Sequence, residues 1–405
     1  MSQTPLNFLC VSTYFKGADF LRACKEAGNN VYLLTVPKLE HEPWPRDHID
    51  DIFYFEVDDQ GGWNREHVLN GLAYRFRTIH FDKFVALDDF DVEKVAFLRE
   101  YFRMPGMGET TARYFRDKLA MRMKAREEGI NVPEFTALFN DAAINNFADN
   151  VPPPWLIKPR SEASATGIRK IHDKDELWRN LDELGDKRHH CLLERFTPGD
   201  VFHVDALSFD GKVKFARVSQ YLDAPFDVAH GGGIFRSHTV EQDGSDDKAL
   251  QKLTRKVMKA FGMEYSASHT EFIKTFDDGK YYFLETSSRV GGANLSDMVE
   301  AASGINLWAE WARLETAKAR NTKYDPPEDS GRNAGIVVSL SRFEHPDSSV
   351  FADPEIVWRM QKAWHIGMVV ASDKRERILE LLDNHTKRIA SDFHASAPAP
   401  DRPTN

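Results

Sequence analysis

Two glutamates in the second half of the chain are spaced to face each other across a hairpin. In HTEFIKTFDDGKYYFLE, the Asp-Asp-Gly at 277–279 has the composition of a three-residue hairpin loop, in which a type I turn ends in a left-handed glycine. With this loop Phe276 faces Lys280, and counting outward places Glu271 opposite Glu285 on one face. Directly opposed carboxylates repel each other, so the pair indicates a bound divalent cation such as Mg²⁺ or Mn²⁺. Two alternatives stay open: a two-residue loop would put the glutamates on opposite faces, and both could simply face water.

A lysine and a loop of small residues follow an apolar run, Trp155 to Ile157, that predicts a buried strand. Lys158 ends this strand, so its stem is buried while its ammonium group can meet an anion at the strand end. The next loop, SEASATG at 161–167, could fold its amide groups around phosphate oxygens. The alternatives are a surface lysine and an ordinary hairpin loop.

An arginine and two glycines follow the second glutamate. Arg289 lies four residues beyond Glu285, and Gly291 and Gly292 permit close approach of a substrate to the backbone. A guanidinium group beside a cation site suits phosphoryl transfer, in which several charged oxygens must be neutralised. The alternative is an arginine that only pairs with a nearby acid.

Several common catalytic motifs are absent from the sequence. It contains no GxxxxGK[ST], no HExxH and no GxSxG, and the three glycines at 231–233 lack the GxGxxG continuation. Cys10, Cys24 and Cys191 are far apart with no CxxC pair, which argues against a disulfide framework and a cysteine-rich zinc site. They are expected to be buried thiols.

Composition narrows the class of protein further. The 405 residues are 41% hydrophobic and 29% charged, which is typical of a globular protein of two or three domains. The net charge of −10 argues against a nucleic-acid partner and against binding to an anionic membrane. No signal peptide and no apolar run of about 18 residues is found, so we expect a cytoplasmic protein.

The elements that must position these residues follow from hydrophobic periodicity. Strands at 7–11, 31–36 and 83–87 alternate with helical segments, which predicts a small α/β domain with a parallel sheet. One continuous helix is predicted from about 111 to 128, with Met123 on its buried face. Asp210-Gly211 predicts a tight hairpin, and residues 331–394 form a last strand-and-helix unit. The proline-rich tail, 395–405, is expected to be disordered.

In their order along the chain, these features resemble the ATP-grasp superfamily. Four segments carry the resemblance: DKLAMRMKAREEGINVPEF, PWLIKPRSEASATGIRKI, LLERFTPGDVFHVD and HTEFIKTFDDGKYYFLETSSRVGG. The first unit is similar to the Rossmann-like domain of biotin carboxylase-like proteins, and GGGIFRSH with the last segment resembles the amino-acid ligase branch. The implied α/β fold has a Rossmann-like domain at 1–110, an ATP-grasp domain at 111–330 with a mobile lobe at about 125–200, and a C-terminal subdomain at 331–394.

The resemblance also implies roles for individual residues. ATP would be bound through its phosphates by two lysines and the small-residue loop, through adenine by a hinge backbone, and through Mg²⁺ or Mn²⁺ by carboxylates. The phosphate residues are Lys118, Lys158, Ser161 and Ser164; the hinge residues are Glu194, Arg195 and Phe196; the metal ligands are Glu271, Glu285 and Ser287. Arg289 and Lys158 would be the catalytic residues.

Three positions depart from the family pattern. Val201 replaces the acid that commonly binds the ribose, for which His203 or Asp205 on the same strand face could substitute. Ser287 replaces a metal-binding asparagine, and the phosphate loop is rich in alanine where glycine is usual. Because the carboxylates and lysines are present, an active enzyme is expected.

The resemblance implies a carboxylate–amine ligase. A small-molecule carboxylate would be phosphorylated by ATP, and a small-molecule amine would displace phosphate from the acyl phosphate. Two alternatives are a carboxylase of the biotin-dependent type, which phosphorylates bicarbonate, and a nucleotide-binding regulatory module without turnover. A homodimer is a further expectation.

Overall fold

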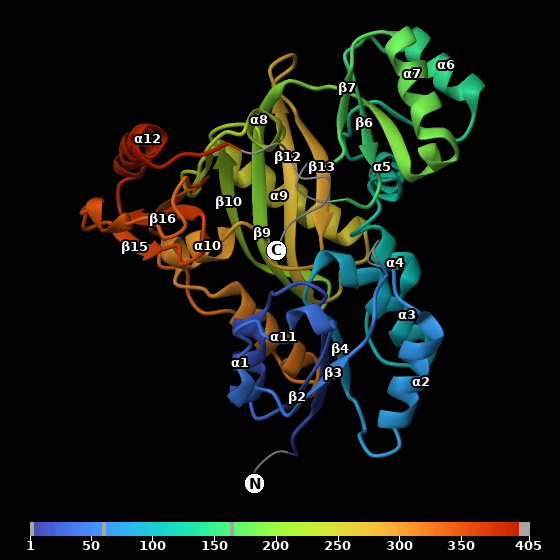
Figure 1. Ribbon diagram of the computed structural model, residues 1–405, viewed down its shortest axis with the longest axis vertical. Coiled ribbons are helices and arrows are strands. Elements are labelled where there is room, and N and C mark those ends of the chain that lie inside the picture. The colour runs from blue at the N-terminus through green and yellow to red at the C-terminus, as the bar shows by residue number, and fades with distance from the viewer. Residues whose placement is uncertain (1–3, 59–61, 163–165, 397–405) are drawn as a thin grey trace.

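The computed structural model describes residues 4–58, 62–162 and 166–396, and builds them into three β-sheets (Figure 1). The predicted disordered tail falls almost entirely outside these residues. Cys10, Cys24 and Cys191 are buried and unpaired, as expected. None of the helices in the described ranges is long and apolar enough to cross a membrane.

The N-terminal sheet is parallel, as predicted, with strand order β3-β2-β1-β4. Its strands are β1 (Asn7–Val11), β2 (Asn30–Thr35), β3 (Asp51–Tyr54) and β4 (Lys83–Ala86), and its helices are α1 (Ala18–Glu26), α2 (Arg65–Arg75) and α3 (Val92–Phe102). A fourth helix, α11 (Leu307–Ala319), comes from much later in the chain and packs against α1. Trp311 of α11 contacts Phe20 of α1 at a ring separation of 5.1 Å.

The helix predicted from 111 to 128 is wrong as one piece. The chain forms α4 (Glu109–Arg113) and α5 (Lys118–Glu127), because Asp117 between them caps α5 by accepting a hydrogen bond from the Leu119 amide at 2.9 Å. The break changes the buried face, so Met123 is exposed and Met121 is buried instead. It also places Lys118 at the first position of a helix.

A small lobe, residues 135–195, follows α5 and contains an antiparallel sheet with strand order β5-β8-β6-β7. Its elements are β5 (Phe135–Ala137), α6 (Asp141–Asn150), β6 (Trp155–Pro159), β7 (Arg169–Ile171), α7 (Lys174–Leu184) and β8 (Cys191–Arg195). The lobe stands apart from the rest of the molecule at the upper right of Figure 1. Lys158 is the last residue but one of β6, close to the strand end that the apolar run predicted.

The central sheet has eight strands in the order β13-β12-β9-β10-β11-β14-β16-β15. The strands are β9 (Gly199–Phe209), β10 (Lys212–Tyr221), β11 (Phe235–Thr239), β12 (Ser266–Thr275), β13 (Tyr281–Ser287), β14 (Asn333–Leu340), β15 (Ile356–Arg359) and β16 (His365–Ser372). The helices are α8 (Pro225–Gly231), α9 (Ser245–Ala260), α10 (Leu295–Ser303) and α12 (Arg375–Asp392). The predicted hairpin between β9 and β10 is confirmed, and Asp210 and Gly211 both have positive φ.

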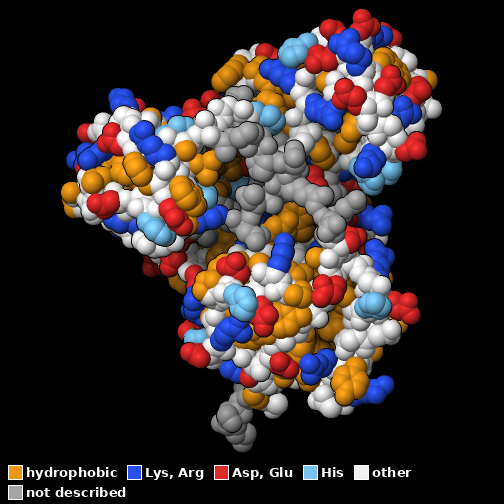
Figure 2. Space-filling model, in the orientation of Figure 1, with side chains coloured by type: hydrophobic (Ala, Val, Ile, Leu, Met, Phe, Trp, Pro, Cys, Tyr) orange, Lys and Arg blue, Asp and Glu red, His pale blue; other side chains and the backbone are white. Residues whose placement is uncertain are grey.

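The last unit of the chain completes the central sheet. β14 pairs with β11, and α10 and α12 pack on opposite faces around Ile336 and Val337. The boundaries of the predicted domains stay a prediction, but β14 and β16 share one sheet with β9 to β13. Figure 2 shows acidic and basic side chains interspersed over one face, without an extended patch of one sign among the side chains that the structure describes.

Candidate active site

A cavity of about 590 Å³ lies between the small lobe and the central sheet, and it gathers most of the residues that the sequence singled out. Its lining includes Lys118, Lys158, Glu194, Arg195, Phe196, Glu271, Glu285, Ser287 and Arg289. Ser161 and His203 are not part of the lining, and Ser164 lies outside the described residues. Lining residues that the sequence did not single out include Asp89, Arg116, Arg122, Tyr221 and His269.

The opposed glutamates are confirmed, but the predicted loop was wrong. The amide of Thr275 donates to the Lys280 carbonyl, which leaves four residues in the loop instead of three. Near the loop the strands are therefore paired one residue away from the predicted register, with Phe272 opposite Phe283. A β-bulge at the next step restores the register, so Glu271 faces Glu285.

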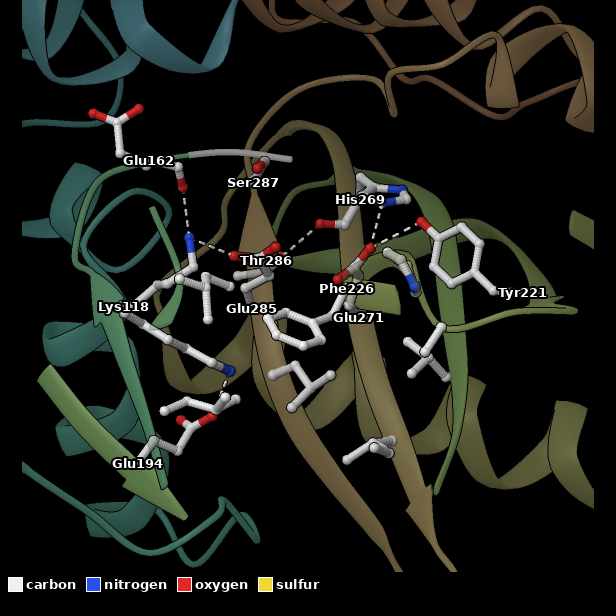
Figure 3. A pocket seen from close by; sticks show the side chains of 18 of the residues that line it. Lys118, Glu162, Glu194, Tyr221, Phe226, His269, Glu271, Glu285, Thr286 and Ser287 are labelled. Atoms are coloured by element: carbon white, nitrogen blue, oxygen red, sulfur yellow. Dashed lines mark hydrogen bonds and ion pairs between the residues drawn. The ribbon is translucent and has the colours of Figure 1, made fainter. Parts of the chain in front are cut away.

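Each glutamate has its own partners (Figure 3). The Lys118 ammonium lies 2.6 Å from Oε2 of Glu285 and donates to the Glu162 carbonyl at 2.6 Å. The Tyr221 hydroxyl donates to Oε1 of Glu271 at 2.8 Å, and Nε2 of His269 lies 3.7 Å from the same oxygen. These contacts offset the repulsion between the carboxylates. The carboxylate oxygens that remain are hard donors of the kind that Mg²⁺ and Mn²⁺ bind, so the residues fit a divalent cation.

Lys158 is held by a buried ion-pair triad. Its ammonium lies 2.6 Å from Oε1 of Glu194, and Nε of Arg122 lies 2.6 Å from Oε2. Burial by itself would raise the pKa of Glu194, but Arg122 and Lys158 lower it to about 2. Glu194 is therefore charged at neutral pH and orients Lys158. Sequence reasoning missed Arg122, for which the only signal was a basic residue on the buried face of a helix.

Two backbone amides of the predicted hinge already donate hydrogen bonds within the protein. The amide of Arg195 donates to the Glu134 carbonyl at 2.8 Å, and the amide of Phe196 donates to the Pro154 carbonyl at 3.0 Å. The next residue, Thr197, lines the cavity, and its amide has no hydrogen-bond acceptor among the residues that the structure describes. It is the hinge amide most available to a ligand.

Arg289 shares one carboxylate with a second arginine. Its Nη2 lies 3.3 Å from Oδ2 of Asp89, and Nη1 of Arg116 lies 3.5 Å from the same oxygen. Burial by itself would raise the pKa of Asp89, but Arg289 and Arg116 lower it to about 2. Within the described part of the chain, Oδ1 of Asp89 and Nε of Arg289 are buried without a hydrogen-bond partner. The available signal for Asp89 was its place after β4, where the carboxyl ends of parallel strands gather ligands.

Arg116 also ties the small-residue loop to this cluster. Arg116 donates a hydrogen bond to the Ser161 carbonyl. Ser161 therefore contacts this cluster through its backbone and not through its hydroxyl.

The suggested ribose ligands point elsewhere. His203 and Asp205 are fully buried, and both ring nitrogens of His203 are engaged, Nδ1 with Asp205 and Nε2 with Ser237, each at 2.8 Å. Neither residue reaches the cavity, so the structure contradicts the ribose role suggested for them. The cause is a shared interior network, in which Asp205 also binds Nδ1 of His269 at 2.8 Å.

The charge of this network is set by His269. Burial by itself would lower the pKa of His269, but the carboxylates of Asp205 and Glu271 raise it to about 10. The ligand atoms of His203, Asp205 and His269 lie within 4.8 Å of one another, as in some metal sites. These atoms are already occupied by the hydrogen bonds of Asp205 to His203 and to His269.

No protein-family model matches the chain, but similar proteins and solved structures are found. The chain is 28% identical over 317 residues to an L-arginine-specific L-amino acid ligase of Bacillus subtilis, covering 76% of this chain and 75% of that protein. It is 23% identical over 206 residues to a D-alanine–D-alanine ligase of Neisseria gonorrhoeae, covering 50% and 67%. The crystal structure of an L-amino acid ligase from Bacillus licheniformis superposes with a TM-score of 0.73 at 18% identity, covering 97% of this chain and 99% of that one. The chain has the ATP-grasp fold, and its sequence relatives lie in the carboxylate–amine ligase branch of that superfamily.

Proposed function

We propose that this protein is an ATP-dependent ligase that joins a small-molecule carboxylate to a small-molecule amine and releases ADP and phosphate. One observation carries the proposal: a single cavity holds two lysines, two opposed glutamates and a buried arginine, in a chain related to amino-acid ligases.

Each part of ATP has a matching part of the cavity. The adenine would meet the hinge at the Thr197 amide, and the phosphates would meet Lys118 and Lys158. Mg²⁺ or Mn²⁺, held by Glu271, Glu285 and Ser287, would neutralise phosphate oxygens. This arrangement asks the protein for positioning and charge, and not for a covalent intermediate.

The protein's residues then divide the work of two steps. In the first, an oxygen of the substrate carboxylate attacks the γ-phosphorus, the bond to the β-phosphate oxygen breaks, and ADP leaves. In the second, the amine attacks the acyl carbon, phosphate leaves with the bonding electrons, and the amine loses a proton. Arg289 would stabilise the transferred phosphoryl group and the acyl phosphate. Asp89, which contacts Arg289, would be a positioning residue.

The relatives favour ligation over the two alternatives. A biotin-dependent-type carboxylase would phosphorylate bicarbonate, and this chain has no AMKM-like biotinylation sequence. A module without turnover could hold nucleotide with the same lysines and carboxylates, but the relatives of this chain are named as ligases. The proposal does not specify which two substrates are joined. Arginine is one candidate because of the Bacillus subtilis relative. A cytoplasmic location and a homodimer are part of the proposal, the former because the reaction consumes ATP.

A substrate screen tests the function. Phosphate release from magnesium-ATP would be measured over pairs of the standard amino acids and small carboxylates, and mass spectrometry would identify the product. We expect ADP, phosphate and an amide in equal amounts for at least one pair. In the same assay, Lys158→Ala should lower turnover by roughly a hundredfold, because a preorganised cation at the transferred charge is lost. Turnover only with bicarbonate and biotin, or tight ATP binding with no ADP formation, would contradict the proposal.

A further inference from the structure

The two carboxylate oxygens of Glu271 have different surroundings. The Tyr221 hydroxyl donates to Oε1 at 2.8 Å, and Nε2 of His269 lies 3.7 Å from that same atom. Among the described residues, Oε2 accepts no hydrogen bond. One oxygen is therefore committed to the protein and the other is available in the cavity (Figure 3).

Glu285 shows the same division. Its Oε2 is paired with Lys118 at 2.6 Å, and within the described ranges Oε1 accepts no hydrogen bond. The facing glutamates thus offer one oxygen each.

The groups that hold Glu271 are themselves fixed. Tyr221 is buried, with its ring 4.7 Å from the His203 ring and 5.7 Å from the Phe235 ring. Such packing leaves its hydroxyl little freedom to leave Glu271.

His269 is fixed by a chain of hydrogen bonds among residues of β12, β9 and β11. Nδ1 of His269 bonds Asp205, Asp205 bonds His203, and His203 bonds Ser237 on β11, each at 2.8 Å. Gly291 lies directly against the first of these bonds: a Cβ there would be 2.7 Å from Oδ1 of Asp205 and 2.8 Å from Nδ1 of His269. The absence of a side chain at Gly291 therefore leaves room for this hydrogen bond. None of these residues has a role in the mechanism proposed above.

We propose that Tyr221 and the chain His269–Asp205–His203 are positioning residues that reserve a single oxygen of Glu271 for the cation and thereby select Mg²⁺ or Mn²⁺ over Ca²⁺. This inference rests on the proposed function in one respect, the presence of a cation between the glutamates. Ca²⁺ takes six to eight oxygens and often uses both oxygens of one carboxylate, whereas Mg²⁺ is smaller and octahedral and suits one oxygen from each. A glutamate with one oxygen already occupied disfavours Ca²⁺.

The test is a competition for the site that does not depend on catalysis. Binding of Mn²⁺ to the full-length protein, with a non-hydrolysable ATP analogue present, would be followed by the electron paramagnetic resonance signal of free Mn²⁺. Mg²⁺ and Ca²⁺ would then be titrated as competitors. Tyr221→Phe frees Oε1 of Glu271 with little change of shape, so the affinity for Ca²⁺ relative to Mg²⁺ should rise about tenfold, as expected for losing an outer contact of a metal ligand.

Two further variants make the test specific. Tyr282→Phe is the matched control, because this hydroxyl bonds Asp278 in the hairpin loop and the residue does not line the cavity; its cation preference should equal that of the unmodified protein. His269→Asn removes the other contact and should shift the preference in the same direction as Tyr221→Phe.

The outcomes separate this inference from the proposed function. Mn²⁺ binding with an unchanged Ca²⁺ to Mg²⁺ ratio in both Tyr221→Phe and His269→Asn overturns the inference and leaves the ligase proposal intact. A failure of the unmodified protein to bind Mn²⁺ overturns the inference together with the metal assignment. A ratio that rises in both variants but not in Tyr282→Phe supports it.

Discussion

Two guanidinium groups around one carboxylate leave a net positive charge at the cavity wall. Asp89 contacts both Arg289 and Arg116, and all three side chains are largely buried. Because one negative charge cannot balance two positive ones, a ligand anion would complete the cluster. The transferred phosphoryl group is the natural anion for a ligase of the proposed type.

Replacement of Asp89 by Asn should separate positioning from binding. Arg289 would lose its fixed partner while the hinge and the lysines are untouched, so we expect kcat to fall by about tenfold to a hundredfold with KM for ATP nearly unchanged. Steady-state kinetics measures both constants. Asp89→Glu should restore part of kcat. Asp19→Asn is the control, because this exposed acid contacts Arg22 and Asn306 and does not line the cavity. An unchanged kcat in Asp89→Asn would remove this residue from the mechanism.

The sequence predicted the residues that lie in local motifs and missed those that meet across the fold. Glu271, Glu285 and Lys158 could be identified because a turn or a strand end lies within a few positions of each. Arg289 was predicted, but its partner Asp89 lies 200 positions away along the chain and meets it only through the packing of two sheets. His203 was misjudged for the same reason, because a strand face does not reveal whether it is open to the cavity.

At the scale of the element, the hairpin shows how a correct pairing can come from an incorrect loop. The composition of 277–279 favours a three-residue loop, but the structure has four residues there and a compensating bulge near Glu271. The sequence does not specify such a bulge, because apolar side chains on both sides of it can pack in either register. The interruption between α4 and α5 was missed because the apolar spacing continues across it.

Three elements are tied together by the Glu194 triad, which predicts a measurable pH dependence. The pKa of Glu194 is lowered from 4.5 to about 2 in the folded protein, a difference of roughly 3 kcal/mol in favour of the folded state. Because the folded pKa lies below the unfolded one, this stabilisation is complete above about pH 4.5 and is lost as the pH falls toward 2. Glu194→Gln should therefore have a lower free energy of unfolding than the unmodified protein at pH 7. The difference between the two free energies should become smaller as the pH falls.

Urea unfolding of both proteins at a series of pH values from 6 to 3 measures this difference in free energy. Glu183→Gln is a suitable control, since this acid pairs with Arg169 at the surface of the small lobe. A difference in free energy that stays constant over the whole series would show that Glu194 does not provide the stabilisation.

At the scale of the whole molecule, weak contacts join the small lobe to the central sheet across the cavity. Arg195 pairs with Asp277 at 3.3 Å, and His230 of α8 lies 3.3 Å from the Ile168 carbonyl, both at exposed positions. Exposed contacts of this kind contribute little to stability, so we expect the small lobe to move as a body on the hinge.

Nucleotide should restrict that motion. In hydrogen exchange followed by mass spectrometry, we expect the amides of residues 155–162 and 166–171 to exchange about tenfold more slowly with a magnesium-bound ATP analogue at saturation. Helix α2, which contributes no residue to the lining of the cavity, is the internal reference and should not change. Equal exchange rates in the lobe with and without nucleotide would argue against closure.

The position of α11 has a consequence for synthesis on the ribosome. This helix supplies Trp311 to the core of the N-terminal sheet, yet it follows α3 by more than two hundred residues. At about 5–20 residues per second, α11 emerges roughly 10 to 40 seconds after α3 has been made. Until then the apolar side of α1, including Phe20, lacks its cover. The N-terminal core therefore stays incomplete while the sheet of the small lobe and strands β9 to β13 are translated. This makes the uncovered surface a natural target for chaperones that bind exposed apolar helices.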